Sequence, residues 1–78
     1  MSKAFVLVSI DLSDLGSAHE LQLELKKIEG VVGVYLVYGN YDIIVEIETE
    51  SAGRLRDVVF NRIRALAHVR STLTLTVV

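Results

Sequence analysis

The pattern strand–helix–strand occurs twice in this chain, once on each side of the dipeptide Gly39–Asn40. The first unit runs from Lys3 to Tyr38 and the second from Tyr41 to Val78. A β-α-β-β-α-β order is that of the ferredoxin-like split βαβ motif. Right-handed crossovers put both helices on one face of the sheet. We therefore predict an α+β fold, with a four-stranded antiparallel sheet and two helices on one of its faces.

The strands are predicted from alternating or β-branched runs. They cover Lys3–Leu12, Val31–Tyr38, Tyr41–Thr49 and Val69–Val78. A Gly-Asn pair between two such runs is typical of a two-residue hairpin, because both residues tolerate a positive φ. Gly39–Asn40 therefore predicts a tight hairpin between the second and third strands.

The first helix is predicted to follow a loop over Asp11–Gly16. Ser17 and Glu20 have the spacing of a capping box, in which each side chain bonds the other residue's backbone N–H. Gly30 is placed for a left-handed cap at the end of this helix. One apolar stripe supports the helix: Leu21, Leu25 and Ile28.

The second helix is predicted to begin after a cap at Thr49 or Ser51. Its apolar stripe is formed by Leu55, Val58, Val59, Ile63 and Leu66, and Phe60 extends that face.

The small size of the chain predicts self-association. Seventy-eight residues make one domain, 1–78, with a marginal core. Small domains compensate with disulfides, a metal or oligomerisation. The chain has no cysteine, and its two histidines lack ligand spacing, so we expect no metal and no cofactor. A hydrophobic fraction of 51% and a mean hydropathy of +0.46 indicate more apolar surface than one core hides.

The sheet face without helices is the expected contact surface. We predict that it carries Phe5, Leu7, Tyr35, Val37 and Ile44 together with the threonines of the last strand. Such a surface predicts sheet-to-sheet or edge-to-edge pairing with another copy.

Charge argues against a nucleic-acid partner. The net charge is −2 and the pI about 5.5, whereas a phosphate-binding surface needs clustered cations. No apolar run has the length of a membrane span, and Ala4–Ile10 is too short for a signal peptide. The sequence therefore predicts a soluble, cytoplasmic protein without direct nucleic-acid or membrane contact.

Catalytic residue patterns are weak. Glu46 and Glu48 could be paired carboxylates, but spacing of two along a strand is common and fits a solvated face. His19 and His68 are far apart in the chain and are predicted at helix ends. The turn Tyr38–Asp42 is the stronger candidate, because it brings a carboxylate and several backbone N–H groups to one end of the sheet.

Several short motifs occur together in a recognisable order. They are Ala4–Val8, Val31–Tyr35, Gly39–Ile43, Ile63–Leu66 and Val69–Thr74. Together they resemble the effector domain, or RAM domain, of the leucine-responsive/asparagine-regulator (Lrp/AsnC) transcription factors, over essentially the whole chain. The family usually has an opening hydrophobic strand, a G-x-Y/F-D turn and a V-x-x-T-x-T ending. All three are present here.

The resemblance implies a small-molecule-binding and oligomerisation module rather than an enzyme. It implies a dimer of the α+β barrel type built through the sheets, with dimers often joined into rings of eight or ten chains. It also implies an amino-acid effector bound at contacts between dimers. Regulators of the family place a helix-turn-helix domain ahead of this one, whereas this sequence starts at the effector domain. Met1–Lys3 looks like a natural start, so we expect a stand-alone domain that is able to co-assemble with full-length regulators of the family.

The resemblance also implies where an amino acid would bind. The turn supplies Tyr38, Gly39, Asn40, Tyr41 and Asp42, and the last strand lies nearby. Asp42 would accept a charge-assisted bond from the ammonium, and turn N–H groups or hydroxyls would take the carboxylate. The candidate hydroxyls are Ser71, Thr72 and Thr74.

Three of these turn residues also have a purely structural interpretation. Gly39 makes the turn, Asp42 bonds turn N–H groups, and Tyr41 packs in the core. Two alternative functions follow: an enzyme of the dimeric α+β barrel type, with His68 in a cleft, and an assembly module without ligand. An RNA-binding domain would need exposed aromatics and a basic surface.

Overall fold

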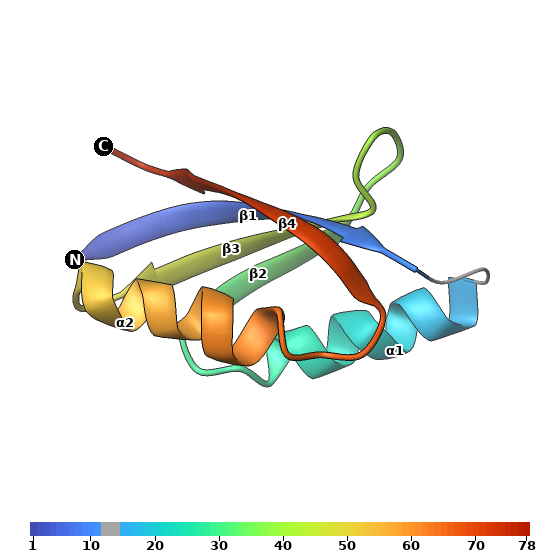
Figure 1. The fold of residues 1–78 in the computed structure, drawn as a ribbon, viewed down its shortest axis with the longest axis horizontal. Helices are drawn as coiled ribbons and strands as arrows, with labels where there is room; N and C mark the ends of the chain where they lie inside the picture. Colours follow the sequence, from blue (N-terminus) through green and yellow to red (C-terminus); the bar gives the residue numbers. More distant parts are fainter. Residues whose placement is uncertain (12–14) are drawn as a thin grey trace.

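The computed structural model describes residues 1–11 and 15–78, and in the first helix it describes side chains from Ala18 onward. The elements follow the order β1 (Ser2–Ile10), α1 (Leu15–Lys26), β2 (Val31–Leu36), β3 (Ile43–Thr49), α2 (Ala52–Asp57), η1 (Val58–Ile63) and β4 (Val69–Thr76). They form one antiparallel sheet in the order β2-β3-β1-β4. Both helices lie on one side of it (Figure 1). The predicted ferredoxin-like α+β fold is confirmed.

The core lies between the sheet and the helices. Residues directly opposite in an antiparallel pair point to the same face. In β1 and β3, Val6 lies opposite Val45 and both are fully buried. The helices contribute Leu25 from α1 and Leu55 from α2 to the same cluster. The other buried apolar residues of this cluster are Ala4, Val8, Leu21, Val34, Ile43, Ile47, Val58, Val59 and Ile63.

The first helix begins at Leu15, two residues before the predicted cap. Ser17 therefore lies inside α1, and the predicted capping box is wrong. Glycine and serine are tolerated in the first turn of a helix, so Gly16 and Ser17 do not prevent α1 from starting earlier. The predicted end of β1 at Leu12 falls outside the described residues, and the described strand ends at Ile10.

The glycine after α1 has the predicted conformation but another role. Gly30 has φ +98°, as expected for a left-handed position. The helix already ends at Lys26, and Gly30 instead leads into β2. Its carbonyl accepts a hydrogen bond from the Glu48 N–H at 2.9 Å, which joins this turn to β3.

The second helix changes type along its length. Ser51 is its N-cap, as one of the two predicted candidates, and its hydroxyl accepts from the Arg54 N–H at 3.1 Å. After Asp57 the chain continues as the π-helix η1, which the apolar stripe does not predict. The Arg64 N–H donates to the Val59 carbonyl, five residues back. Single π-helical turns are often found near functional sites.

The last strand ends at Thr76, two residues before the predicted end. Thr72, Thr74 and Thr76 lie opposite Val8, Val6 and Ala4, which are buried on the helix side. The prediction that these threonines line the uncovered face is therefore wrong. The sheet face on which the threonines lie is decided by the pairing register of β1 and β4, which shifts between Ser9 and Ile10. The sequence pattern within β4 does not reveal this register.

The sheet face turned away from the helices is here called the open face. Its centre is apolar, because Leu73 lies opposite Leu7 and Leu75 lies opposite Phe5. Ile44, opposite Leu7 on the other side, continues this apolar surface. Lys3, Tyr35, Glu46 and Glu48 also lie on the open face.

Candidate functional site

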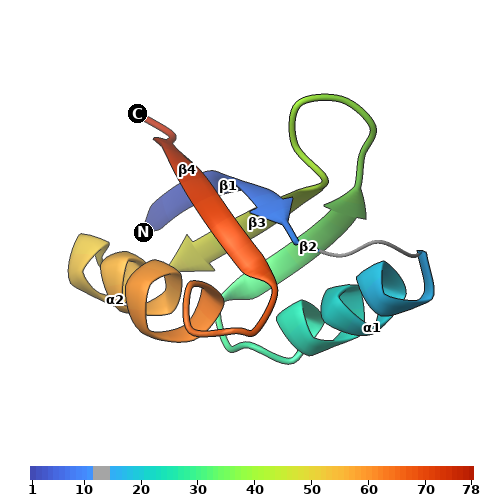
Figure 2. The ribbon, with the colours of Figure 1, turned by 45° about the vertical axis from the view of Figure 1, so that its right-hand side comes forward.

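The connection between β2 and β3 is a wide loop, not the predicted two-residue hairpin. Leu36 and Ile43 form the last pair of the two strands, so the loop spans residues 37–42. It is closed by the Val37 N–H, which donates to the Asp42 carbonyl at 2.9 Å. The loop projects away from the helices (Figures 1 and 2). Tyr38 is fully exposed at this projection.

Gly39 is needed in this loop for its backbone conformation. Its φ of +145° lies in the region that favours glycine, and a Cβ added there would meet nothing within 4 Å. The predicted role of Gly39 in the turn is confirmed. Asn40 was expected to share a positive φ, but His68 is the one non-glycine residue with a positive φ among the described residues. The positive φ expected for Asn40 is therefore wrong.

Asp42 joins the loop to the end of β1. Its Oδ2 atom accepts a hydrogen bond from the Ile10 N–H at 3.0 Å, and its own N–H donates to the Val8 carbonyl at 2.9 Å. The expected bonds to N–H groups within the turn are replaced by this contact across the sheet. A carboxylate has about four acceptor sites, so Oδ1 can still accept from a ligand.

The predicted hydroxyls do not all lie near the loop. Asp42 directly precedes β3, which flanks β1 on one side, whereas Ser71 is in β4 and pairs with Ser9 on the other side of β1. Two strand spacings, roughly 10 Å, therefore separate Asp42 from Ser71. Thr72 and Thr74 lie on the helix side of the sheet. Thr74 borders a separate groove of about 230 Å³ between α2, η1 and β4. One chain therefore does not bring the predicted site residues together.

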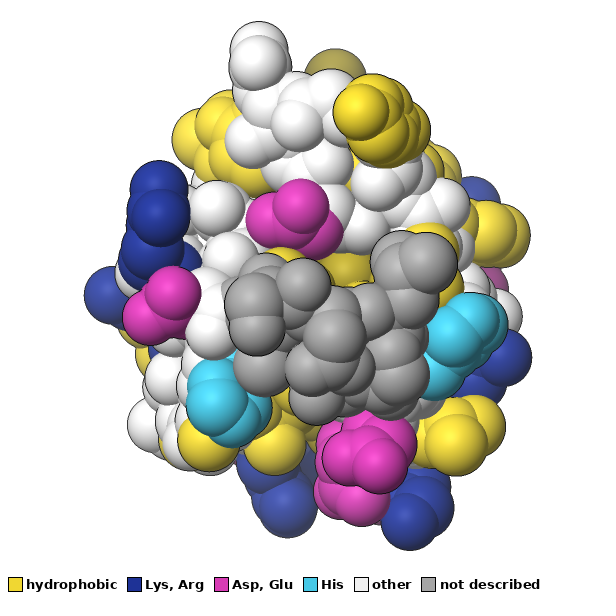
Figure 3. All heavy atoms as spheres, turned by 90° about the vertical axis from the view of Figure 1, so that its right-hand side faces the viewer, with side chains coloured by type: hydrophobic (Ala, Val, Ile, Leu, Met, Phe, Trp, Pro, Cys, Tyr) yellow, Lys and Arg dark blue, Asp and Glu magenta, His cyan; other side chains and the backbone are white. Residues whose placement is uncertain are grey.

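The end of the molecule that bears the loop is seen in Figure 3. The loop forms an uncharged projection with hydrophobic side chains near its tip, and an acidic side chain lies beneath it. Tyr41, half-buried, and the exposed Tyr38 are the aromatic residues of the loop. The surface here is a projection rather than a cleft, which suits a site completed by another molecule.

A polar cluster on the open face was missed by the sequence reasoning. The Lys3 ammonium lies 3.0 Å from Glu46 Oε2, and the Tyr35 hydroxyl donates to Glu46 Oε1 at 3.2 Å. These residues come from β1, β3 and β2. Glu46 is thus paired with a cation and not with Glu48 as an acid–base couple. The pairing register of β1 and β3 brings Lys3 close to Glu46, so a correct prediction of that register would have revealed the cluster.

Protonation equilibria follow from these contacts. The hydrogen bond from Lys3 holds the pKa of the Glu46 carboxyl below its ordinary value, against partial desolvation, and the Tyr35 hydroxyl adds to the effect. The same bond raises the pKa of the Lys3 ammonium, and the nearby Glu48 carboxylate contributes. Both groups are therefore charged at neutral pH.

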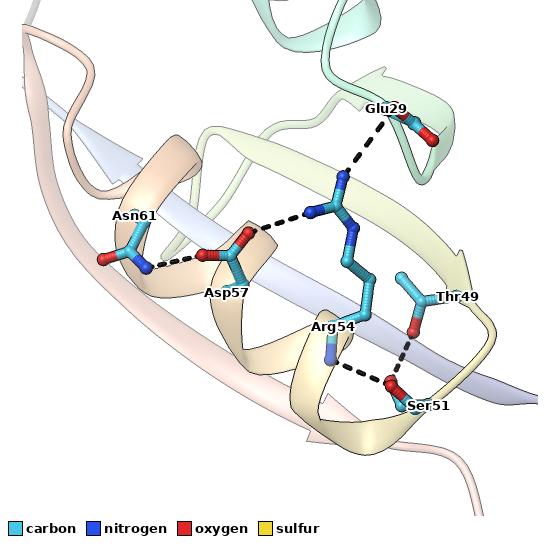
Figure 4. A network of polar contacts seen from close by, with 6 residues as sticks. All are labelled: Glu29, Thr49, Ser51, Arg54, Asp57 and Asn61. Atoms are coloured by element: carbon cyan, nitrogen blue, oxygen red, sulfur yellow. Dashed lines mark hydrogen bonds and ion pairs between the residues drawn. The ribbon is translucent and has the colours of Figure 1, made fainter.

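A second polar network joins α2 and η1 to the turn between α1 and β2 (Figure 4). The Arg54 guanidinium contacts Asp57 at 3.1 Å and Glu29 at 3.7 Å. Asp57 also accepts from the Asn61 amide at 2.6 Å. Arg54 thereby links α2 to the α1–β2 turn, which is a structural contact.

Both histidines, His19 and His68, are exposed. His68 is exposed and lines a groove of about 430 Å³ beside α1, together with Glu20 and Glu24. Over residues 1–11 and 15–78, no group of three or more His, Cys, Asp or Glu side chains is arranged to hold a metal ion. In the same residues, no helix is long and apolar enough to span a membrane.

Comparison with known proteins identifies one family. The family model described as the Lrp/AsnC ligand binding domain matches residues 3–78. A relative from Pyrococcus furiosus, named as an uncharacterized HTH-type transcriptional regulator, is 29% identical over 72 residues. That alignment covers 92% of this chain and 48% of the relative. The chain therefore spans about half the length of the curated relatives it matches.

Solved structures show the same fold. The crystal structure of FFRP-DM1 has a TM-score of 0.86 and 29% identity, and the match covers 100% of both chains. A transcriptional regulator from Neisseria meningitidis, solved as a complex with L-Met, has a TM-score of 0.85 and 16% identity. That match covers 99% of this chain and 49% of the regulator, and it shows likeness of fold alone.

Proposed function

This chain belongs to the family of Lrp/AsnC ligand-binding domains, and on that premise we propose that it binds an amino-acid effector and assembles with copies of itself. The proposed role is the modulation of transcriptional regulators of the same family, by co-assembly with their full-length chains. The proposed assembly is a dimer formed through the open faces, and dimers join into a ring of eight or ten chains.

The apolar open face is the observation that carries self-assembly. Leu73 and Leu75, which lie opposite Leu7 and Phe5, are 45% and 49% exposed. Tyr35, which lies opposite Ile44 on the same sheet face, is 51% exposed. A contiguous exposed apolar patch on a small domain is typical of a protein–protein contact. A second copy presents the same patch, and isologous dimers pair identical surfaces.

The loop 37–42 supports the amino-acid site. Asp42 accepts the Ile10 N–H through Oδ2, and we propose that its Oδ1, which has no hydrogen-bond partner among the described residues, accepts from an ammonium group. Tyr38 and Tyr41 belong to the same loop, and we propose that they contact the ligand side chain. The Neisseria meningitidis regulator with this fold was solved with L-Met, which supports amino acids as the ligand class.

The proposed site is shared between copies. Within one chain, β1 lies between the loop and the strand that carries Ser71, Thr72 and Thr74. Thr72 and Thr74 also lie on the helix side of the sheet. We propose that these hydroxyls take part from a neighbouring copy that faces the loop. Ligand binding and assembly beyond the dimer are then coupled, because the neighbour supplies part of the pocket.

Isothermal titration with each proteinogenic amino acid tests the ligand, and sedimentation velocity tests the assembly. The informative variant is Asp42→Asn, which keeps an acceptor for the Ile10 N–H but removes the charge that an ammonium needs. We expect it to remain folded and to lose the heat of binding. Glu50→Gln, an exposed acid elsewhere, is the matched control and should bind as wild type.

No heat with any amino acid, together with a monomer in sedimentation, would contradict the whole proposal. An assembly without ligand is the second candidate, favoured by the open face alone. It predicts a wild-type oligomer whose size and melting temperature respond to no amino acid, and an Asp42→Asn variant that behaves identically.

A further inference from the structure

The groove between α2, η1 and β4 exists because the helices do not cover the whole sheet. β4 is an edge strand, and on its helix side it carries Thr72, Thr74 and Thr76. The residues of β1 opposite Thr74 and Thr76 are fully buried, whereas Thr74 and Thr76 themselves are exposed. Part of the helix-side face of β4 is therefore open, and the groove of about 230 Å³ borders it.

The groove has an apolar wall and a wall with hydroxyl groups. The helix side contributes Leu55, Val59 and Phe60, and Phe60 is 52% exposed. The sheet side contributes Thr74 and Thr76, whose hydroxyls can donate or accept a hydrogen bond. Ligand sites are typically apolar with a few polar groups, and those for drug-sized molecules measure roughly 300–1,000 Å³. This smaller groove has the size for a small metabolite.

Arg56 is the charged residue among those that line the groove. Its side chain is exposed, and it has no ion-pair partner in the part of the chain that the structure describes. Arg54, two residues earlier, is by contrast paired with both Asp57 and Glu29. No acidic residue lines the groove within the described residues. Its charge therefore favours an anion.

Arg64 adds a second positive charge next to the apolar wall. Its guanidinium lies 5.1 Å from the centre of the Phe60 ring, where the ring face attracts a cation. Among the described residues, Arg64 also has no ion-pair partner. This side of the molecule is thus locally positive although the whole chain has a net charge of −2.

We propose that this groove binds a small monocarboxylate that carries an apolar chain. The Arg56 guanidinium donates to the two carboxylate oxygens, and the hydroxyls of Thr74 and Thr76 are further donors. The apolar chain of the ligand lies against Phe60. An amino acid fits less well, because its ammonium would meet a cation and no acid. A phosphate monoester fits less well, because it carries nearly two negative charges against one guanidinium.

This site goes beyond the proposed function and does not depend on it. The proposed amino-acid site is centred on Asp42 in the loop 37–42, whereas this groove is centred on Arg56. The groove lies on the helix side of the sheet, so a dimer formed through the open faces leaves it accessible. Thr74 is common to both sites, so the variants chosen to separate them leave Thr74 unchanged.

NMR titration of the isotope-labelled full chain with isocaproate tests the proposal. Isocaproate is leucine without its ammonium group, so it lacks the group that Asp42 would bind. We expect saturable shifts of the backbone amide signals of Ala52, Arg56, Phe60 and Thr74, with a dissociation constant on the order of 1 mM. Isohexanol has the same carbon chain without the charge and should bind about tenfold more weakly.

Variants at exposed arginines test the role of the charge. Arg56→Met keeps an apolar stem but removes the guanidinium, so isocaproate should bind about tenfold more weakly or worse. Arg56→Lys keeps the charge without the two-pronged geometry and should be intermediate. Arg62→Met is the matched control, because Arg62 is an exposed arginine of η1 that borders another groove. Arg62→Met and Asp42→Asn should both bind isocaproate as wild type does.

The outcomes separate this inference from the proposed function. The groove site is overturned if isocaproate shifts no signals, or if its shifts lie in the loop 37–42. It is also overturned if Arg56→Met and Arg62→Met bind isocaproate equally, or if isohexanol binds as tightly as isocaproate. If isocaproate binds in the groove while no amino acid produces heat, the groove site stands and only the amino-acid site at Asp42 fails.

Discussion

At the scale of single residues, Asp42 has two tasks assigned to different atoms. Oδ2 holds the Ile10 N–H, a contact between residues 32 positions apart, and Oδ1 is the atom proposed for the ligand. The residue type and the turn pointed to Asp42, but the partner in β1 could not be read from the chain. Hydrogen bonds between distant strands depend on a register that local patterns do not encode.

The structural task of Asp42 predicts a loss of stability. Asp42→Ala leaves the half-buried Ile10 N–H without its acceptor and should lower the free energy of unfolding by about 1–2 kcal/mol. Asp42→Asn retains an acceptor and should lose less. Urea denaturation followed by circular dichroism measures both, with Glu50→Ala as an exposed control. Equal stability of the Ala and Asn variants would show that the hydrogen bond contributes nothing measurable.

Two glycines should respond in opposite directions to substitution by alanine. Gly39 has φ +145°, so Gly39→Ala should destabilise the chain by about 1 kcal/mol or more. Gly53 lies in α2, where an added Cβ meets only the Ser51 hydroxyl oxygen at 3.9 Å, so Gly53→Ala should stabilise by roughly 0.5–1 kcal/mol. Thermal unfolding of the two variants in parallel checks the signs. If Gly53→Ala is destabilised instead, the added methyl group meets a contact at the start of α2 that is closer than 3.9 Å.

At the scale of elements, periodicity predicted which segments are helices and strands, but not how they end. α1 starts earlier than its capping signal, and α2 passes into η1 instead of continuing as an α-helix. In η1, residues 58 and 63 lie one π-turn apart, and Val58 and Ile63 are both buried. Packing against the sheet therefore outweighs local helix preference in this segment.

The contact between β1 and β3 predicts a pH dependence. Because the pKa of Glu46 is held below its ordinary 4.5 in the folded chain, its stabilising effect is complete above pH 4.5 and is lost as pH falls through the lowered value. Because the pKa of Lys3 is raised above 10.5, its effect is complete below 10.5 and is lost as pH rises through the raised value. Between these limits the contribution does not change with pH.

Urea denaturation of wild type and Lys3→Met, at low protein concentration, measures this dependence. We expect a stability difference at about pH 6 that diminishes as the pH falls below 4.5, the ordinary pKa of Glu46, and through its lowered pKa in the folded chain. Lys27→Met serves as the control for loss of an exposed cation. A difference that persists unchanged in acid would assign the effect of Lys3 to packing on Phe5 and not to Glu46.

At the scale of the whole molecule, the helices cover one face of the sheet and leave the other exposed (Figure 2). The hydrophobic composition predicted such a surplus of apolar surface. Its position differs from the expectation, because Leu73 and Leu75 occupy the places assigned to the threonines. The proposed interface is consequently more apolar than the sequence indicated.

This surface predicts the effect of a charge on assembly. Leu75→Glu places a carboxylate in the apolar centre of the open face and should raise the dimer dissociation constant by about tenfold or more. The fold should persist, because the side chain is half-exposed in the single chain. Leu23→Glu, at an exposed position of α1, is the control. If sedimentation velocity shows that Leu75→Glu and Leu23→Glu assemble equally, the interface is not on the open face.

The sequence by itself determined the order of the elements, the α+β class and the family resemblance, because alternation, helical spacing and turn residues act within a few positions along the chain. It also identified Gly39 and Asp42 as special positions of the turn. Only the tertiary structure decided three other features: the face of the threonines, the Asp42–Ile10 hydrogen bond and the Lys3–Glu46–Tyr35 cluster. All three depend on pairing between strands far apart in sequence, where a shift of one residue exchanges the two faces of a strand.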